Sequence, residues 1–362
     1  MFHKAPNIIV FYYILWVMGE ERVYIKMGRN VGIAGMGFYV PENVVTNKEL
    51  GKYADTTDEW ISTKLGIRER RFASEDQALS DLAYPAALQA IENSGLEPRD
   101  IQLIIVCAIN HDRRAPSTAV ILQKRLGAKK AAAFDVNVGG CPGSCYSLVI
   151  GQQFVENSMY DNVLIITGDV YSKFVDITDR DVSVFFGDGV GAAVLRPCKS
   201  NTGFVSSLLG ADGEWGADKI VCEGGSRVPI SEGALKNRQL GITMDSKEVW
   251  KFGTKIFPMT VKQVTQDAGY QLTDLDWVIP HQANINMIKY GMYRLKLPME
   301  KTFTNLHKFG NTGAGSVIIA LAEAVQTGVI KPGQLVALSS FGAGFSWGSV
   351  LTRWCDKDDF GI

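Results

Sequence analysis

The sequence of 362 residues lacks an excess of either charge. It has 37 lysines and arginines against 38 aspartates and glutamates, and it contains no long basic or acidic run. A strong surface field of one sign, which would attract nucleic acid or an anionic membrane, is therefore missing. We expect neither nucleic acid nor a membrane as the main partner.

Cysteine and histidine occur in no pattern that would hold a metal or a set of disulfides. The six cysteines form no CxxC pair, and the four histidines do not cluster beside them. A disulfide framework and a zinc site are therefore not predicted. This cysteine usage favours a reducing, cytoplasmic compartment.

The sequence also lacks an apolar run long enough to span a bilayer. The run over residues 8–18 has 11 residues, whereas a membrane helix needs about 20. It has neither the basic start nor the small-residue cleavage site of a signal peptide. We predict that residues 1–28 are an extension and that Met27 is the true translation start. A membrane-surface or packing role for this extension is the alternative.

Hydrophobic residues make up 46% of the chain, which also has 37 glycines, and this composition fits a buried α/β protein with many tight turns. Short apolar runs alternate with amphipathic stretches from Val31 onward. Expected strands cover 31–35, 101–107, 131–136 and 162–167, and expected helices cover 58–65, 80–94, 116–126 and 141–156. A second series follows with helices 249–266, 283–295 and 313–327 and strands 276–280, 335–340 and 346–354.

The two series predict two similar halves, residues 29–200 and 201–362, fused without a Pro/Ser-rich linker. In the second half, Pro258 lies within the expected helix 249–266. We expect it to end or kink that helix, because proline has no N–H and its ring clashes with the preceding turn.

Cys141 lies at a sharp corner between a strand and a helix. Gly139 and Gly140 before it permit a tight turn, and Pro142 after it suits the first helical position. A thiol at a helix N-terminus meets the positive end of the helix dipole, which predicts a lowered pKa and a reactive thiolate. Cys145, one turn later, reads as a core residue.

His281 and Asn311 lie at two further corners of the same kind. His281 directly follows the apolar strand that ends at Pro280, where open α/β sheets place ligand-binding residues. Asn311 stands between Gly310 and Thr312 at the start of the helix 313–327. Taken alone, Asn311 would be interpreted as a helix cap.

Together with several other motifs, these corners resemble those of the β-ketoacyl-acyl-carrier-protein synthase III family, whose members are thiolase-fold condensing enzymes. The motifs follow the family's order over residues 29–355. They are Asp58-Glu59-Trp60-Ile61, Gly66-Ile67-Arg68-Glu69-Arg70, the Cys141 corner, Phe186-Gly187-Asp188-Gly189, His281-Gln282-Ala283-Asn284, Gly310-Asn311-Thr312 and Phe341-Gly342-Ala343-Gly344. The combination is far more specific than any single glycine-rich run.

The resemblance implies a five-layer α-β-α-β-α thiolase fold, a homodimer and the reaction that initiates fatty acid biosynthesis. Cys141 would take an acyl group from acyl-CoA, and malonyl-acyl carrier protein would then lose carbon dioxide and attack it. His281 and Asn311 would stabilise the enolate, and the backbone amides of Cys141 and Gly344 would form the oxyanion hole. The resemblance implies neither a metal nor a redox cofactor.

The resemblance also assigns substrate-binding residues, some of which depart from the family. Trp60 would stack on the adenine of coenzyme A, and Lys64 and Lys173 stand where the family has arginines. Lysine keeps the charge but loses the planar fork of arginine. Asn286 stands where the family has an arginine linked to carrier-protein docking, and Lys289 and Arg294, further along the same helix, are candidates to take over that role.

Two more departures concern the acyl group. Ala115 stands where many members have a phenylalanine that closes the partner subunit's acyl pocket, which predicts a longer or wider pocket. The approach to Cys141, residues 137–140, is one residue longer than in the family.

Three other readings remain open at this point. The chain could be a relative in a specialised pathway, a ketosynthase or acyltransferase that uses a larger acyl donor. It could be a non-decarboxylating relative such as 3-hydroxy-3-methylglutaryl-CoA synthase, which Asn311 argues against. It could also be a non-catalytic dimer partner, although such partners typically lose the nucleophile.

Overall fold

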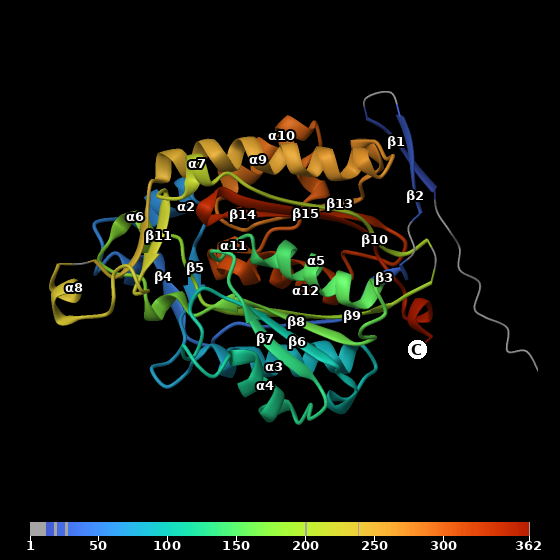
Figure 1. The fold of residues 1–362 in the computed structure, drawn as a ribbon. Helices are drawn as coiled ribbons and strands as arrows, with labels where there is room; N and C mark the ends of the chain where they lie inside the picture. The colour runs from blue at the N-terminus through green and yellow to red at the C-terminus, as the bar shows by residue number, and fades with distance from the viewer. Residues whose placement is uncertain (1–11, 18–19, 26–27, 200, 238, 362) are drawn as a thin grey trace, which may run out of the picture.

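The computed structural model describes residues 12–17, 20–25, 28–199, 201–237 and 239–361. Figure 1 shows five layers, in which two sheets alternate with three layers of helices. The middle layer holds α5 (Gly143–Glu156) and α12 (Ser316–Gln326), with the short α11 (Leu306–Phe309) beside them. The outer layers hold α3 (Leu79–Asn93) and α4 (Thr118–Leu126) on one side, and α9 (Ser246–Asp267) and α10 (Ile285–Leu295) on the other.

The first sheet has the order β3-β9-β8-β6-β7. Its strands are β3 (Val31–Tyr39), β9 (Gly189–Pro197), β8 (Val163–Asp169), β6 (Leu103–Cys107) and β7 (Ala132–Val136). The pairs β3–β9 and β9–β8 are antiparallel, whereas β8–β6 and β6–β7 are parallel. Strands β6 and β8 are buried throughout, as expected for strands covered by helices on both faces.

The second sheet repeats this pattern with the order β10-β15-β14-β13. Its strands are β10 (Gly203–Ala211), β15 (Ser346–Arg353), β14 (Leu335–Gly342) and β13 (Trp277–Pro280). Two antiparallel pairs are again followed by a parallel pair, and Thr302 adds a parallel bridge to Val278 at the place of a fifth strand. The predicted five-layer fold of two similar halves is therefore confirmed. The boundary at residue 200 stays a prediction.

The remaining elements are short. They are β4 (Val44–Thr46), β5 (Glu69–Arg71), α1 (Asn47–Leu50), α2 (Asp58–Lys64), α6 (Arg180–Ser183), α7 (Gly213–Gly216), α8 (Glu232–Lys236), β11 (Ile220–Glu223) and β12 (Gly241–Met244). Strands β4 and β5 form one antiparallel pair, and β11 and β12 form another.

The prediction that Pro258 ends its helix is wrong, because α9 continues through it to Asp267. The alternative, a kink at Pro258, stays a prediction. One backbone hydrogen bond, from residue 258 to the carbonyl of Thr254, cannot form. The apolar face of α9 outweighs this loss, since it buries Phe252, Phe257 and Val261 against β14 and β15. Burial of each such side chain contributes about 1.5–3 kcal/mol.

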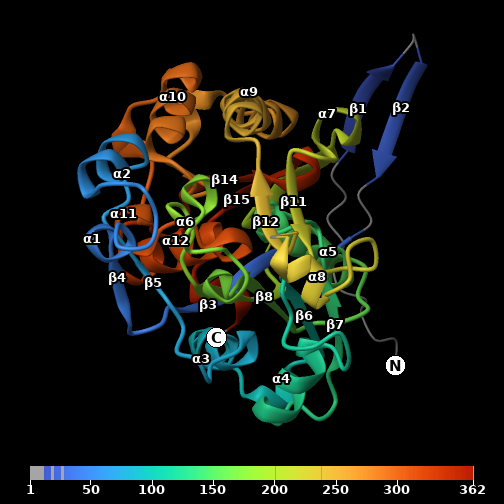
Figure 2. The ribbon, with the colours of Figure 1, turned by 90° about the vertical axis from the view of Figure 1, so that its left-hand side faces the viewer.

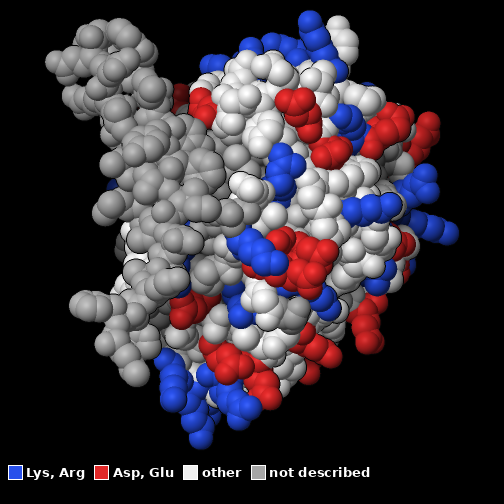
Figure 3. All heavy atoms as spheres, turned by 90° about the vertical axis from the view of Figure 1, so that its right-hand side faces the viewer, with Lys and Arg blue, Asp and Glu red and all other residues white. Residues whose placement is uncertain are grey.

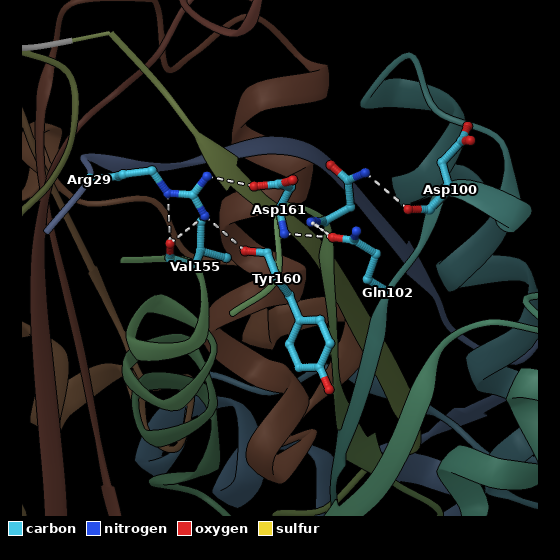
Figure 4. Close-up of polar contacts among 7 residues, drawn as sticks. Arg29, Asp100, Gln102, Val155, Tyr160 and Asp161 are labelled. Atoms are coloured by element: carbon cyan, nitrogen blue, oxygen red, sulfur yellow. Dashed lines mark hydrogen bonds and ion pairs between the residues drawn. The ribbon is translucent and has the colours of Figure 1, made fainter. Parts of the chain in front are cut away.

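Arg29 fastens the beginning of the main body (Figure 4). Its guanidinium donates to the carbonyl oxygens of Val155 at 2.7 Å and Tyr160 at 3.1 Å, and to the Asp161 carboxylate at 2.5 Å. In the N-terminal extension, β1 (Tyr12–Val17) pairs antiparallel with β2 (Glu20–Ile25). The rest of residues 1–27, including Met27, lies outside the described residues.

The surface agrees with the balanced composition. On the face in Figure 3, acidic and basic side chains are interspersed over the part of the chain that the structure describes. Among the described helices, none is long and apolar enough to span a membrane.

The contacts of Arg29 lead to a stability prediction. We expect Arg29→Ala to lower the free energy of unfolding by about 1–2 kcal/mol, because it removes charge-assisted hydrogen bonds between the start of the body and the loop before β8. Urea unfolding measures this. Arg99→Ala is the control, since its ion pair with Glu97 is largely exposed and should contribute nothing measurable. Equal midpoints for the two variants would contradict the prediction.

Candidate active site

The first turn of α5 meets the short 3-10 turn Gly313–Gly315, which directly precedes α12, in the middle layer. The Ser144 hydroxyl donates to the carbonyl of Ala314. A Cβ added to Gly143 would lie 3.0 Å from the Cβ of Ala314, closer than side chains normally pack. This contact brings the residues just before each helix together, and the side chains of Cys141 and Asn311 interact there.

The corner before Cys141 depends on glycine. Gly139 and Gly140 have φ angles of 76° and 91°, in the left-handed region that other residues rarely adopt. A Cβ on Gly140 would also lie 2.5 Å from Ile109. The two glycines therefore permit the sharp corner that the sequence predicted before Cys141. That this approach is one residue longer than in the family stays a prediction.

The structure corrects the predicted pKa of Cys141. Its thiol faces a cavity with apolar walls, where burial and the nearby Asp169 raise its pKa to about 12. These effects oppose the helix dipole, whose stabilisation of the thiolate was the basis of the prediction. Cys145 and Cys107 are fully buried, as expected for core residues.

His281 lies at the end of β13 and is almost fully buried. Its Nδ1 is hydrogen-bonded to the Ser316 hydroxyl at 2.6 Å, and the edge of its ring meets Phe341. Burial lowers the pKa of His281 to about 3, so the ring is neutral at physiological pH. A neutral imidazole carries one proton, and Nδ1 is already engaged with Ser316.

Asn311 is not a helix cap, because Gly315 occupies the cap position of α12. Its Oδ1 accepts a hydrogen bond of 2.9 Å from the Gly313 amide. This contact fixes the orientation of the side chain and leaves the Nδ2 donor available. The bond itself is the i to i+2 contact that capping residues make, and it is made here to the short turn Gly313–Gly315 that precedes α12. The catalytic role of Asn311 stays a prediction.

Cys141, His281 and Asn311 line one cavity. Its other walls are mostly apolar and come from Ile109, Tyr171, Phe185, Phe186, Ile242, Met244, Trp250, Phe252, Met287 and Phe341. A second cavity adjoins the first, and the two share Ile109, Ile220 and Ile242. The second cavity is also lined by Gly344, whose φ is 68°. In the described part of the chain, the Cys141 amide has no hydrogen-bond acceptor.

The predicted nucleotide-binding residues Trp60, Lys64 and Lys173 have different surroundings. Trp60 lies in α2, and the guanidinium of Arg180 from α6 stacks over its ring at 4.3 Å. Figure 2 shows both helices on the same face of the molecule. Lys64 is exposed at the end of α2, whereas the Lys173 amine donates to the carbonyls of Ser74 and Glu75.

Sequence reasoning missed Arg180. A basic residue directly after the polar pair Thr178-Asp179 was the available signal. Its contact with Trp60 joins segments far apart in the sequence, so neither local pattern nor spacing indicated it.

The predicted carrier-protein docking residues Asn286 and Lys289 both lie on α10. Asn286 donates to the carbonyls of Thr63 and Lys64 and so ties α10 to α2, whereas Lys289 is exposed. Ala115 is exposed and lines neither of the two cavities of its own chain. Its predicted role would require a second copy of the chain.

The chain is similar in sequence to known proteins. Residues 134–213 match the family described as 3-oxoacyl-[acyl-carrier-protein (ACP)] synthase III, and residues 265–354 match the C-terminal part of the same synthase. The chain is 46% identical over 323 residues to a β-ketoacyl-[acyl-carrier-protein] synthase III from Caldanaerobacter subterraneus, covering 89% of this chain and 97% of that protein. A protein of the same name from Clostridioides difficile is 43% identical over 91% of this chain and 99% of its own length.

The fold is also similar to that of solved structures. The 3-oxoacyl-[acyl-carrier-protein] synthase III from Aquifex aeolicus superposes with a TM-score of 0.83 at 35% identity, covering 90% of this chain and 100% of that chain. A priming β-ketosynthase from the R1128 polyketide biosynthetic pathway has the same TM-score at 30% identity, covering 91% of this chain and 98% of that chain.

Proposed function

The chain belongs to the β-ketoacyl-[acyl-carrier-protein] synthase III family of condensing acyltransferases in fatty acid biosynthesis, and we propose that Cys141, His281 and Asn311 carry out its reaction. The convergence of these three side chains on one cavity is the observation that supports this assignment. The first half-reaction is acyl transfer. The Cys141 sulfur attacks the thioester of an acyl-CoA, coenzyme A leaves, and the acyl group stays on the enzyme.

The backbone amides of Cys141 and Gly344 are proposed to hold the oxyanion formed in this step. The unpartnered Cys141 amide favours this role, since an oxyanion hole needs donors that are free before the reaction. The positive φ of Gly344 lets its backbone approach the cavity without a side chain in the way.

The second half-reaction is decarboxylative condensation with malonyl-acyl carrier protein. Loss of carbon dioxide leaves an enolate, whose oxygen needs hydrogen-bond donors. Asn311 Nδ2 is one, because Gly313 holds its Oδ1. His281 Nε2 is the other, provided that the Ser316 hydroxyl donates to Nδ1 and so places the single ring proton on Nε2. The enolate carbon then attacks the acyl group on Cys141.

Trp60 and Arg180 are proposed to bind the nucleotide of coenzyme A. The guanidinium of Arg180 stacks on the indole ring of Trp60. Trp60 thus offers a flat aromatic face that suits an adenine, and Arg180 offers a positive charge that suits a phosphate. Lys64, exposed beside them, adds charge. We place carrier-protein docking near Lys289, and we propose that the enzyme acts as a cytoplasmic homodimer without a metal or redox cofactor.

The second cavity favours an alternative choice of substrate. It shares Ile109, Ile220 and Ile242 with the cavity around Cys141 and so offers space on the other side of these residues. A small Ala115 in the partner subunit would leave more of that space open. A medium or longer acyl donor, as in a specialised pathway, is therefore the second candidate, with the same residues and the same chemistry.

Acyl loading tests the proposed nucleophile. We expect intact-protein mass spectrometry, after incubation with acyl-CoAs from acetyl to long chain, to show one added acyl group on the wild type and none on Cys141→Ala. The chain length that loads fastest then decides between the two substrate classes. No loading from any acyl-CoA or acyl-carrier protein would contradict the proposal.

The two half-reactions separate the roles of the other residues. We expect His281→Ala and Asn311→Ala each to slow condensation by about 10²–10³-fold, because each removes one donor to the enolate. Loading of Cys141 should change by only a few fold. Single-turnover assays with pre-acylated enzyme measure the condensation step. His307→Ala is the control for loss of a histidine, since His307 is exposed and lines neither cavity. Loss of loading with intact condensation would reverse the assignment.

Nucleotide binding is tested by comparing two basic residues. We expect Arg180→Ala to raise the KM for acyl-CoA by about 10-fold, corresponding to a lost cation–π contact. Lys173→Ala should change it less, since its amine is engaged by Ser74 and Glu75. A larger effect at Lys173 would favour the assignment made from the sequence.

A further inference from the structure

Arg70 is a fully buried cation in β5, and its hydrogen bonds in the described part of the chain go to neutral oxygens. Its Nη1 donates to the side-chain oxygen of Asn47 at 2.7 Å and to the Val45 carbonyl at 3.5 Å, and its Nη2 donates to the Val184 carbonyl at 3.0 Å. Burial lowers the pKa of Arg70 to about 10, so the guanidinium is still charged at neutral pH.

A buried charge with neutral partners calls for an explanation, because it has lost its hydration. The carboxylate of Asp58 lies one hydrogen bond further away, since it accepts from Asn47 Nδ2 at 2.8 Å. Replacing buried ionic groups by apolar side chains of similar volume is often neutral for stability. A role of Arg70 in fixing the geometry of the surrounding segments is therefore favoured over a role in stability alone.

One of these segments holds the backbone of Asn311. The Asn311 amide donates to the Phe185 carbonyl at 2.8 Å, and the Asn311 carbonyl accepts from the Gly187 amide at 3.0 Å. These two bonds make a short parallel bridge between the two segments. Phe185 directly follows Val184, whose carbonyl accepts the hydrogen bond of Arg70. The guanidinium therefore anchors the chain one residue before it binds Asn311.

The stem of Arg70 also fills the space beside this bridge. A Cβ added to Gly187 would lie 2.9 Å from the Cβ of Arg70, and one added to Gly310 would lie 3.3 Å from it. Both glycines therefore contact Arg70 without room for a side chain of their own. Gly310 directly precedes Asn311, and its φ of 66° is in the left-handed region that glycine favours. Arg70 thus contacts both segments of the bridge.

We propose that Arg70 is a positioning residue, which holds Asn311 where its Nδ2 can donate to the enolate. The inference rests on the proposed function, in which Asn311 stabilises that enolate. Arg70 lines neither cavity, so it acts through the backbone of Asn311 and not by touching a substrate. The hydrogen bond from Gly313 fixes the side chain of Asn311, and the bridge beside Arg70 fixes its main chain.

The corner at Cys141 is held by a different contact, a hydrogen bond of 3.0 Å from the Ser340 hydroxyl to the Pro142 carbonyl. Arg70 takes no part in this contact. A change at Arg70 should therefore displace Asn311 and leave Cys141 in place. The two half-reactions separate these effects, because loading needs the thiol and condensation also needs the donor to the enolate.

A double-mutant cycle tests this role by single-turnover condensation of pre-acylated enzyme. We expect Arg70→Lys to slow condensation by about 10–10²-fold, because lysine lacks the planar fork that reaches Asn47 and Val184 together, and misplaced catalytic groups lose rate steeply. Loading from saturating acyl-CoA should change by only a few fold. In an Asn311→Ala background, Arg70→Lys should cause no further loss, since a residue that acts through another is not additive with it.

Arg29→Ala is the matched control, because Arg29 also donates to carbonyl oxygens but lies at the end of α5 remote from Cys141. It should lower stability and leave both half-reactions unchanged. Hydrogen exchange adds a measurement that does not depend on activity. The Asn311 amide should exchange faster in Arg70→Lys than in the wild type, and at the wild-type rate in Arg29→Ala.

The outcomes distinguish this role from the proposed function on which it rests. If Asn311→Ala slows condensation and Arg70→Lys does not, the positioning role is overturned and the proposed function stands. An equal loss from Arg70→Lys with and without the Asn311 side chain would overturn the role as well. If Asn311→Ala leaves condensation unchanged, the proposed function fails, while faster exchange of the Asn311 amide would still support the hold of Arg70 on this segment. Should Arg70→Lys not fold, Asn47→Ala, which removes the acceptor of Nη1, decides by the same cycle.

Discussion

The site depends on the close contact between the first turn of α5 and the short turn Gly313–Gly315 that precedes α12. Gly143 and Ala314 face each other without room for larger side chains, and Ser144 bonds across to the Ala314 carbonyl. Ser340 of β14 adds a hydrogen bond to the carbonyl of Pro142. Since the two segments belong to different halves of the chain, these contacts bring the proposed nucleophile of one half against the proposed enolate-binding residue of the other.

The internal repeat explains why the contact occurs at that place. Both halves send a middle-layer helix inward just before the strand that follows it, β8 in one half and β14 in the other. The corners before the two helices therefore fall at equivalent points of the fold and meet at the centre. His281 reaches the same point from the end of β13, where Ser316 of α12 holds its ring.

The sequence predicted the fold and three corner residues that the structure brings to one cavity, because their signals are local. Glycine pairs, a proline and apolar strands mark the corners at Cys141, His281 and Asn311 within a few residues. Arg180 escaped prediction because its contact with Trp60 is a tertiary one. Pro258 was misjudged for a similar reason, since the packing of α9 outweighs the local cost of proline. The pKa of Cys141 depends on surroundings that no local pattern describes.

The raised pKa of Cys141 follows from what the second half of the reaction needs. Hydrogen bonds from His281 and Asn311 stabilise an enolate strongly only where water is excluded and the walls are apolar. The same walls disfavour a thiolate in the resting enzyme, because a buried anion loses its hydration. A single cavity therefore cannot be apolar for the enolate and polar for the thiol. The start of α5 acts in the opposite direction, because the positive end of the helix dipole favours the thiolate of Cys141.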